Sequence, residues 1–140
     1  MKIYFDATFG EHIIDSLRGL FRFHQDPKPR LLHIYDRFER DVKDEEWISE
    51  ISGKDSIVIS CDWGRGKGVR LPVVCKLKKI TLILISPSLH NAKQFHKVRA
   101  VMYVWPDIIK AFKAPAGTCF QITSIGVNYE RFRFEERKEG

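Results

Sequence analysis

Two short hydrophobic runs, each followed closely by an aspartate, place the strongest limits on how this chain folds. Residues 1–5 lead directly into Asp6, and residues 56–61 lead into Asp62. Runs of this length, rich in β-branched residues, are typical of buried parallel strands. Ligands and chemistry in open α/β sheets gather at the carboxyl ends of such strands. We therefore expect Asp6 and Asp62 to share one acidic, metal-binding site, although either one taken alone is equally typical of a helix cap or a turn.

Hydrophobic patterns along the rest of the chain alternate between helix and strand. Ile13, Ile14 and Leu17 recur at helical spacing, which predicts a helix over residues 11–23. The same reasoning predicts strands at 31–35 and 80–85, helices at 44–51, 71–77, 89–105 and 107–112, and a fifth strand at 118–124, at an edge of the sheet. In helix 89–105, Lys93, Lys97 and Arg99 are interleaved with the apolar residues. Such alternation predicts an α/β fold with a largely parallel sheet.

Length and composition are those of a single globular domain. The chain has 140 residues, of which 44% are hydrophobic and 30% charged, enough for one core. Its apolar runs fall well short of the roughly 20 residues that cross a bilayer, and its start lacks a signal-peptide pattern. We expect a cytoplasmic protein without membrane contact. The domain is expected to cover residues 1–125, with 126–140 as a C-terminal strand and charged tail.

The three cysteines and five histidines give no metal-binding or disulfide pattern. Cys61, Cys75 and Cys119 are odd in number and form no C-x-x-C pair, which argues against a disulfide framework and a structural zinc site. The histidines show no i, i+4 pair. The expected metal site therefore uses carboxylate oxygens, and these favour Mg²⁺ or Mn²⁺ over zinc.

The chain as a whole is positively charged, although acids follow its predicted strands. The net charge is +6 and the isoelectric point is about 9.3. Arg65, Lys67 and Arg70 lie in or beside a glycine-rich loop that follows Asp62, where they are expected to bind RNA phosphates. Trp63 is expected either to stack on a base or to pack in the core. Cations that hold phosphates and carboxylates that hold a metal are the two requirements of a nuclease site.

Two further stretches supply candidate ligands. Asp44 stands directly before Glu45, where it is expected to cap a helix, to bind the metal, or to do both. Glu45 is the alternative ligand. Asp36 follows the second strand, and its neighbour Arg37 offers it a structural ion pair instead. Residues 127–134 alternate aromatic with charged side chains, which fits an edge strand or a basic surface for RNA or a protein partner.

Three segments together resemble a PIN-like domain, closest to the VapC-type toxin ribonucleases. They are Phe5-Asp6 with the helix after it, the helix start at residues 44–48, and residues 58–62, which end at Asp62. The resemblance covers about residues 1–112. It implies a three-layer α/β/α sandwich with a central, mainly parallel sheet of four to five strands. It also implies catalytic and metal-binding roles for Asp6, Asp44 and Asp62, a small antitoxin partner and a homodimer. Thr8 stands where related proteins often carry asparagine, and a fourth acid is not assigned.

These observations predict a metal-dependent endoribonuclease, the toxin of a toxin-antitoxin pair. Mg²⁺ or Mn²⁺ bound by the carboxylates would activate water for hydrolysis of RNA phosphodiester bonds. The alternative is a catalytically inactive PIN-like module that binds RNA or protein. A phosphoacceptor receiver domain ranks behind both, because Asp6 stands alone at its strand end and Ile85 is followed by Ser86 and Pro87 instead of a lysine.

Overall fold

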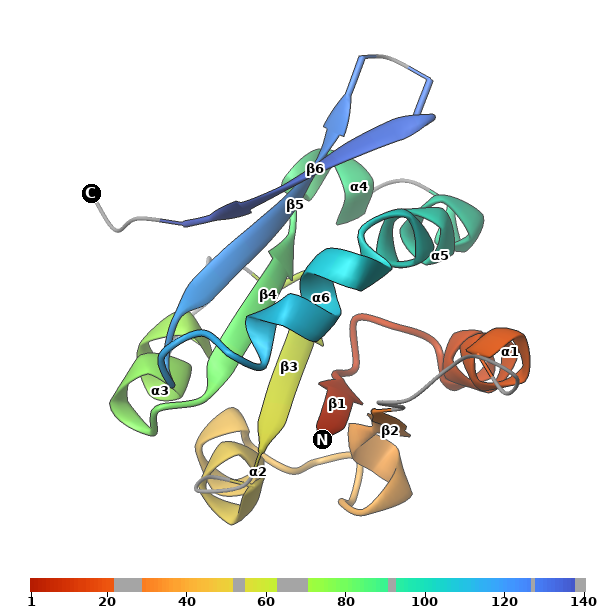
Figure 1. Ribbon diagram of the computed structural model, residues 1–140. Coiled ribbons are helices and arrows are strands. Elements are labelled where there is room, and N and C mark those ends of the chain that lie inside the picture. Colours follow the sequence, from red (N-terminus) through yellow and green to blue (C-terminus); the bar gives the residue numbers. More distant parts are fainter. Residues whose placement is uncertain (22–28, 52–54, 63–70, 91–92, 127, 138–140) are drawn as a thin grey trace.

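A single mixed sheet runs through the molecule (Figure 1). The computed structural model describes residues 1–21, 29–51, 55–62, 71–90, 93–126 and 128–137. Within these ranges the sheet has six strands in the order β2-β1-β3-β4-β5-β6, parallel except for β6, which runs antiparallel to β5. The strands are β1 (Lys2–Phe5), β2 (Arg30–His33), β3 (Ser56–Ser60), β4 (Thr81–Ile85), β5 (Cys119–Ile125) and β6 (Arg131–Glu136).

Helices cover both faces of this sheet, so the α/β architecture predicted from the sequence is confirmed. One core cluster joins α1, α5 and α6 to side chains such as Phe5 and Ile59. A second cluster joins α2 and α3 to Tyr4 and Val58. Because neighbouring strand residues point to opposite faces, each buried strand feeds both clusters. The helices are α1 (Glu11–Phe21), α2 (Asp44–Ile51), α3 (Leu71–Leu77), α4 (Pro87–His90), α5 (Gln94–Tyr103) and α6 (Trp105–Ala111).

The C-terminal part of the sheet differs from the expectation. The fifth strand was expected at an edge, yet β5 pairs on one side with β4 and on the other with β6. The sheet therefore has six strands instead of four to five, and β6 is the edge strand. Phe132 on β6 is buried in the first cluster. Of the two interpretations of residues 127–134, the structure favours an edge strand for the part that forms β6.

Two predicted helix boundaries were wrong. The helix expected over residues 89–105 is divided into α4 and α5. A new helix, α6, then starts at Trp105 with Pro106 in its first turn, where proline leaves no helical hydrogen bond unmade. Proline therefore opens this helix instead of interrupting an earlier one.

The second strand also ends earlier than predicted, at His33. A short 3-10 helix, η1 (Ile34–Asp36), follows it. The His33 ring accepts a hydrogen bond from the Tyr35 amide, while the Asp36 carboxylate accepts one from the His33 amide. This reciprocal capping stops the strand and starts the turn.

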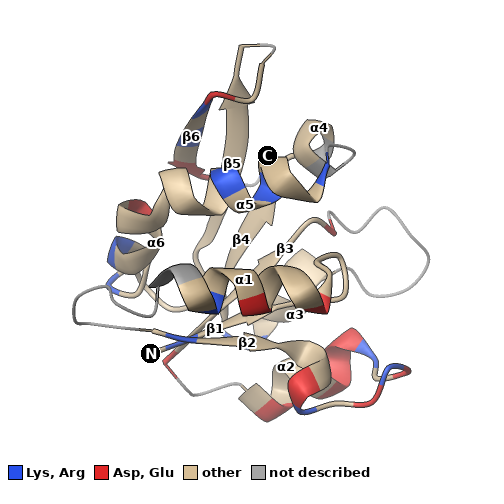
Figure 2. Cartoon of the chain, turned by 90° about the vertical axis from the view of Figure 1, so that its right-hand side faces the viewer, with Lys and Arg blue, Asp and Glu red and all other residues tan. Residues whose placement is uncertain are grey.

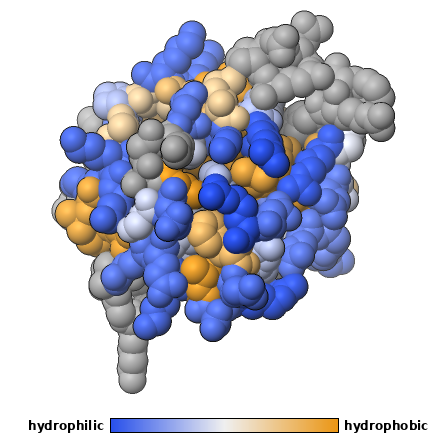
Figure 3. Space-filling model, turned by 90° about the horizontal axis from the view of Figure 1, so that it is seen from below, coloured by the Kyte–Doolittle hydropathy of each residue, from blue (hydrophilic) through white to orange (hydrophobic). Residues whose placement is uncertain are grey.

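The face of the molecule opposite the carboxyl ends of the parallel strands is mainly hydrophilic (Figure 3). Hydrophobic side chains are exposed there in separate areas among charged and polar ones. Among the described residues, none of the helices combines the length and the apolar composition needed to cross a membrane.

Candidate functional site

The register of β1 and β3 places Asp6 and Asp62 at the same end of the sheet. Phe5 pairs with Ile59 in parallel register, and the Asp6 amide donates to the Ile59 carbonyl over 3.3 Å. Asp62 follows the end of β3 by two residues. The two strands are neighbours inside the sheet, so both acids follow the carboxyl ends of adjacent parallel strands, where α/β proteins place their sites.

The Asp6 carboxylate is buried and bound by hydroxyl and amide donors. Its Oδ1 accepts a 3.0 Å hydrogen bond from the Thr8 amide and a second from the Thr8 hydroxyl. Its Oδ2 accepts from the Ser60 hydroxyl. The side chain is only 5% exposed. Asp6 is thus held in one orientation by two neighbouring segments, a turn after β1 and the end of β3.

Burial dominates the acidity of this group. It raises the pKa of Asp6 to about 6, against the lowering effect of the Ser60 and Thr8 hydrogen bonds, and the nearby Asp44 carboxylate raises it further. Desolvation and like charge both disfavour the ionised form of an acid. A cation bound beside Asp6 would reverse this effect by favouring the carboxylate.

The hydroxyls of Thr8 and Ser60 extend this arrangement to the start of the next loop. The Thr8 hydroxyl accepts from the Cys61 amide over 3.0 Å, and the Ser60 hydroxyl accepts from the Asp62 amide over 2.8 Å. Neither hydroxyl was predicted from the sequence to contact Asp6. An aspartate followed two positions later by threonine is a pattern of side-chain-capped turns, and this signal could have identified Thr8.

Asp44 contributes from α2, but it is not the helix cap that the sequence predicted. The Lys43 carbonyl accepts hydrogen bonds from the Glu46 and Trp47 amides, so Lys43 is the cap and Asp44 is the first helical residue. The Asp44 Oδ1 instead accepts from the Trp47 indole nitrogen over 2.9 Å. Glu45 is exposed. Of these two acids, Asp44 is the one whose charge raises the pKa of Asp6.

Asp36, the further candidate ligand, makes structural contacts instead. It forms a 2.7 Å ion pair with Arg18 of α1, not with Arg37, which donates to the Tyr4 hydroxyl. Partial burial acts to raise the pKa of Asp36, but the His33 amide and Arg18 outweigh it and lower that pKa. Asp36 therefore joins β2 and η1 to α1.

The donor chemistry of the site suits a small divalent cation. Within the described part of the chain, no group of three or more His, Cys, Asp or Glu side chains is arranged to enclose a metal ion. Mg²⁺, however, keeps several waters and commonly binds through one or two carboxylates. Asp6 and Asp44, close enough that the Asp44 carboxylate raises the pKa of Asp6, fit that kind of site.

Charge is unevenly distributed around these elements (Figure 2). Acidic residues gather around α2, lysine and arginine occur on α5, and β6 carries both arginine and glutamate. The four residues predicted to bind RNA lie outside the described residues: Trp63, Arg65, Lys67 and Arg70.

Comparison with known proteins gave one match. The model of a family described as a PIN-like domain matches residues 1–64. Neither the curated proteins nor the solved structures gave a match to the chain. The matched segment contains Asp6, Asp44 and Asp62, and the observed α/β fold is consistent with this family. Residues 1–64 therefore carry the sequence pattern of a PIN-like domain.

Proposed function

We propose that this protein is a metal-dependent endoribonuclease whose centre is Asp6. The observation that carries the proposal is the buried Asp6 carboxylate, oriented by Thr8 and Ser60 and close to Asp44, within the segment that matches a PIN-like domain. PIN-like domains are commonly nucleases. The resemblance to VapC-type toxins supports RNA as the substrate and a role as the toxin of a toxin-antitoxin pair.

In this proposal Asp6, Asp44 and Asp62 hold Mg²⁺ or Mn²⁺, with Glu45 as the alternative ligand. When bound, such an ion supplies Lewis acidity that activates water and neutralises charge on the phosphate. The chain keeps the Asp6 oxygens in place through Thr8 and Ser60, so little reorganisation is needed during the reaction. Arg65, Lys67 and Arg70 hold the phosphate backbone, and Trp63 stacks on a base.

The same proposal includes the partners and the cellular location. A small antitoxin protein would cover the acidic site, two copies of the chain would form a homodimer, and the complex would act in the cytoplasm. These features rest on the resemblance to the VapC group.

Cleavage of a panel of labelled RNAs in Mg²⁺, Mn²⁺ or EDTA tests this function. Wild-type protein should cut in either metal and not in EDTA, whereas Asp62→Asn should be inactive while keeping its circular dichroism spectrum. Asp107→Asn is the matched control, because Asp107 is an exposed acid on α6. Full activity of Asp62→Asn would remove Asp62 from the site.

A second candidate is a PIN-like module that binds RNA or protein without cleaving. The observation that favours it is that the described acids form no group of three able to enclose a metal. This candidate predicts retention of RNA or of a co-purifying small protein, with no turnover in any metal. Wild-type binding without cleavage would establish it in place of the nuclease.

A further inference from the structure

Lys97 is a buried cation directly beside the candidate site. It lies on α5, outside the segment that matches the PIN-like family, and its side chain is only 2% exposed. In the sequence, Lys93, Lys97 and Arg99 are interleaved with apolar residues, and no burial was predicted for any of them. In the structure Lys97 instead shares its helix face with Val101, four positions on, and both are buried.

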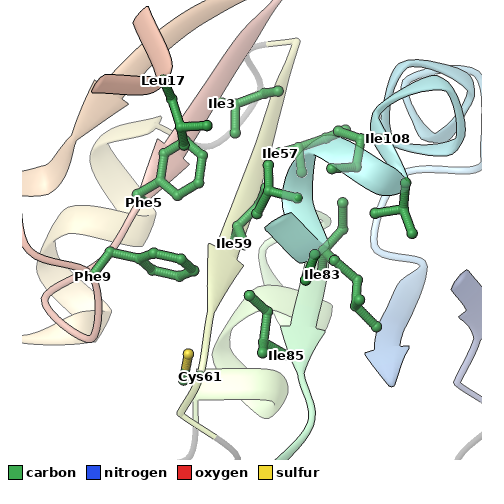
Figure 4. Packing of buried hydrophobic residues seen from close by; sticks show 14 of the residues in the cluster. Ile3, Phe5, Phe9, Leu17, Ile57, Ile59, Cys61, Ile83, Ile85 and Ile108 are labelled. Atoms are coloured by element: carbon green, nitrogen blue, oxygen red, sulfur yellow. The ribbon is translucent and has the colours of Figure 1, made fainter. Parts of the chain in front are cut away.

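The contacts of Lys97 converge on the turn that holds Asp6. Its ammonium nitrogen donates to the Thr8 carbonyl over 3.3 Å and lies 5.8 Å from the centre of the Phe9 ring. Burial raises the pKa of the Cys61 thiol to about 11, and the charge of Lys97 acts in the opposite direction, which places Lys97 near Cys61 as well. Figure 4 shows Phe9 and Cys61 at the carboxyl ends of β1 and β3.

Thr8 links this cation to the carboxylate. Its carbonyl accepts from Lys97, while its amide and hydroxyl donate to Asp6 and its hydroxyl also accepts from the Cys61 amide. A shift of the Thr8 backbone would therefore move both donors to Asp6 Oδ1. Lysine is rarely buried unless it has partners, because taking an ammonium out of water is costly. A methionine would fill the same space without that cost.

We infer that Lys97 is a positioning residue of the candidate site, which fixes the Asp6–Thr8 turn through the Thr8 carbonyl and thereby orients the Asp6 carboxylate. The importance of Lys97 for cleavage rests on the proposed ribonuclease function, whereas its effect on the turn is independent of that function. The inference adds to the site a residue contributed by α5, at a distance of 91 positions along the sequence from Asp6.

Lys97→Met tests this inference, with Lys93→Met as the matched control. Lys93 is exposed on the same helix, at its N-cap, and its side chain makes no capping hydrogen bond. Amide hydrogen exchange reports the turn directly, because the Thr8 amide binds Asp6 and the Cys61 amide binds the Thr8 hydroxyl. In Lys97→Met these two amides should exchange about tenfold faster or more, while the amides of β4 keep their rates.

The values of kcat and KM for RNA cleavage distinguish a residue that positions Asp6 from one that binds substrate. Lys97→Met should lower kcat about tenfold or more and leave KM within about twofold, because the orientation of Asp6 matters in the transition state and Lys97 is buried away from substrate. Lys93→Met should match wild type in both constants. If Lys97→Met does not fold, Lys97→Gln replaces it, because its amide can still donate to the Thr8 carbonyl without a charge; it should then keep slow exchange at Thr8 and Cys61.

Unchanged exchange at Thr8 and Cys61 in Lys97→Met overturns the inference, and so does equal acceleration throughout β4. Fast exchange at these amides in Lys97→Gln would also contradict it. A wild-type protein that cleaves no RNA in any metal would refute the proposed function instead, and the exchange measurement would still decide the role of Lys97.

Discussion

The ionised Asp6 carboxylate lowers the stability of the folded protein because it is buried. A buried acid whose folded pKa of about 6 exceeds the ordinary value of 3.8 is more easily protonated in the folded protein than in the unfolded chain. The folded state therefore binds the extra proton between about pH 4 and pH 6, and stability falls as the pH rises through this window. Above it the charged carboxylate carries the full penalty. Such strain is common where a protein keeps an acid for a function that requires it.

The variant Asp6→Asn should be more stable than wild type at neutral pH. The amide cannot ionise, so the free energy of unfolding should rise by about 1–3 kcal/mol at pH 7 in EDTA, in proportion to the pKa shift. This gain should shrink as the pH falls from 6 to 4, because wild-type Asp6 then becomes neutral as well. Urea unfolding at several pH values measures it, and a variant less stable than wild type at every pH would contradict the shift.

Ser60 is the second residue that decides the state of Asp6. Ser60→Ala removes a donor to Asp6 and leaves the Asp62 amide without the partner it has at Ser60. Because this hydrogen bond lowers the pKa of Asp6, its loss should move the acidic limb of the cleavage rate to higher pH. The cost in stability should be about 1–3 kcal/mol. A pH–rate profile identical to that of wild type would show that Asp6 is not the group that titrates.

At the scale of elements, the sequence predicted those strands and helices whose own residues carry a clear hydrophobic pattern. β1, β3 and β4 are short and mainly apolar runs, and α1 and α2 show clear helical spacing. The pairing of β6 with β5 escaped prediction, because alternating charged and aromatic residues do not reveal which neighbour covers them. The burial of Lys97 escaped it for a similar reason: its environment is made by a turn 89 residues earlier in the chain.

Some residues of the candidate site could likewise be predicted from the sequence, and others could not. Asp6 and Asp62 were predicted to lie at the same edge of the sheet because parallel neighbouring strands end there, and the structure places them after the neighbouring strands β1 and β3. That they share one metal site stays a prediction. The hydroxyl partners Thr8 and Ser60 were not predicted, since serine and threonine are common near strand ends and only geometry shows which ones bind a carboxylate. Asp36 could not be assigned from sequence either, because its partner Arg18 lies on another element.

Asp36→Ala tests the structural assignment of this acid. It should lower the free energy of unfolding by about 1–2 kcal/mol. Most of this cost comes from the lost cap hydrogen bond to the His33 amide, because the ion pair with Arg18 is partly exposed to solvent and screened. RNA cleavage should stay within about twofold of wild type, as expected of a surface substitution away from the site. Thermal unfolding and initial rates measure both effects. A large loss of cleavage with an intact fold would return Asp36 to the list of ligands.

At the scale of the whole molecule, the sheet continues beyond residues 1–64, the segment that matches the PIN-like family. Residues 1–64 supply β1, β2 and β3, and the remaining strands continue the sheet to β6. The division expected at residue 125 coincides with the end of β5, and β6 then pairs along the length of that strand. Phe132 anchors β6 in the core cluster that also contains Phe5 and Phe9. The C-terminal strand is therefore packed against the same core as the site.

Phe132→Ala should destabilise the whole protein. Removing this side chain, which is 4% exposed, should cost about 3–5 kcal/mol through lost burial and a residual cavity. Phe95→Ala is the control, because Phe95 on α5 is 66% exposed and should cost within about 0.5 kcal/mol. Chemical unfolding of both variants measures the difference. Equal stabilities would show that β6 contributes nothing to the common core.

Titration calorimetry of Mn²⁺ binding to wild type and to Asp6→Asn is the most direct test of the claim that Asp6 is the centre of a metal site. Binding to wild type and to Asp107→Asn should be saturable, and the affinity of Asp6→Asn should be lower by about tenfold or more, since a carboxylate ligand is replaced by a neutral amide. Equal affinity of Asp6→Asn and wild type would contradict it.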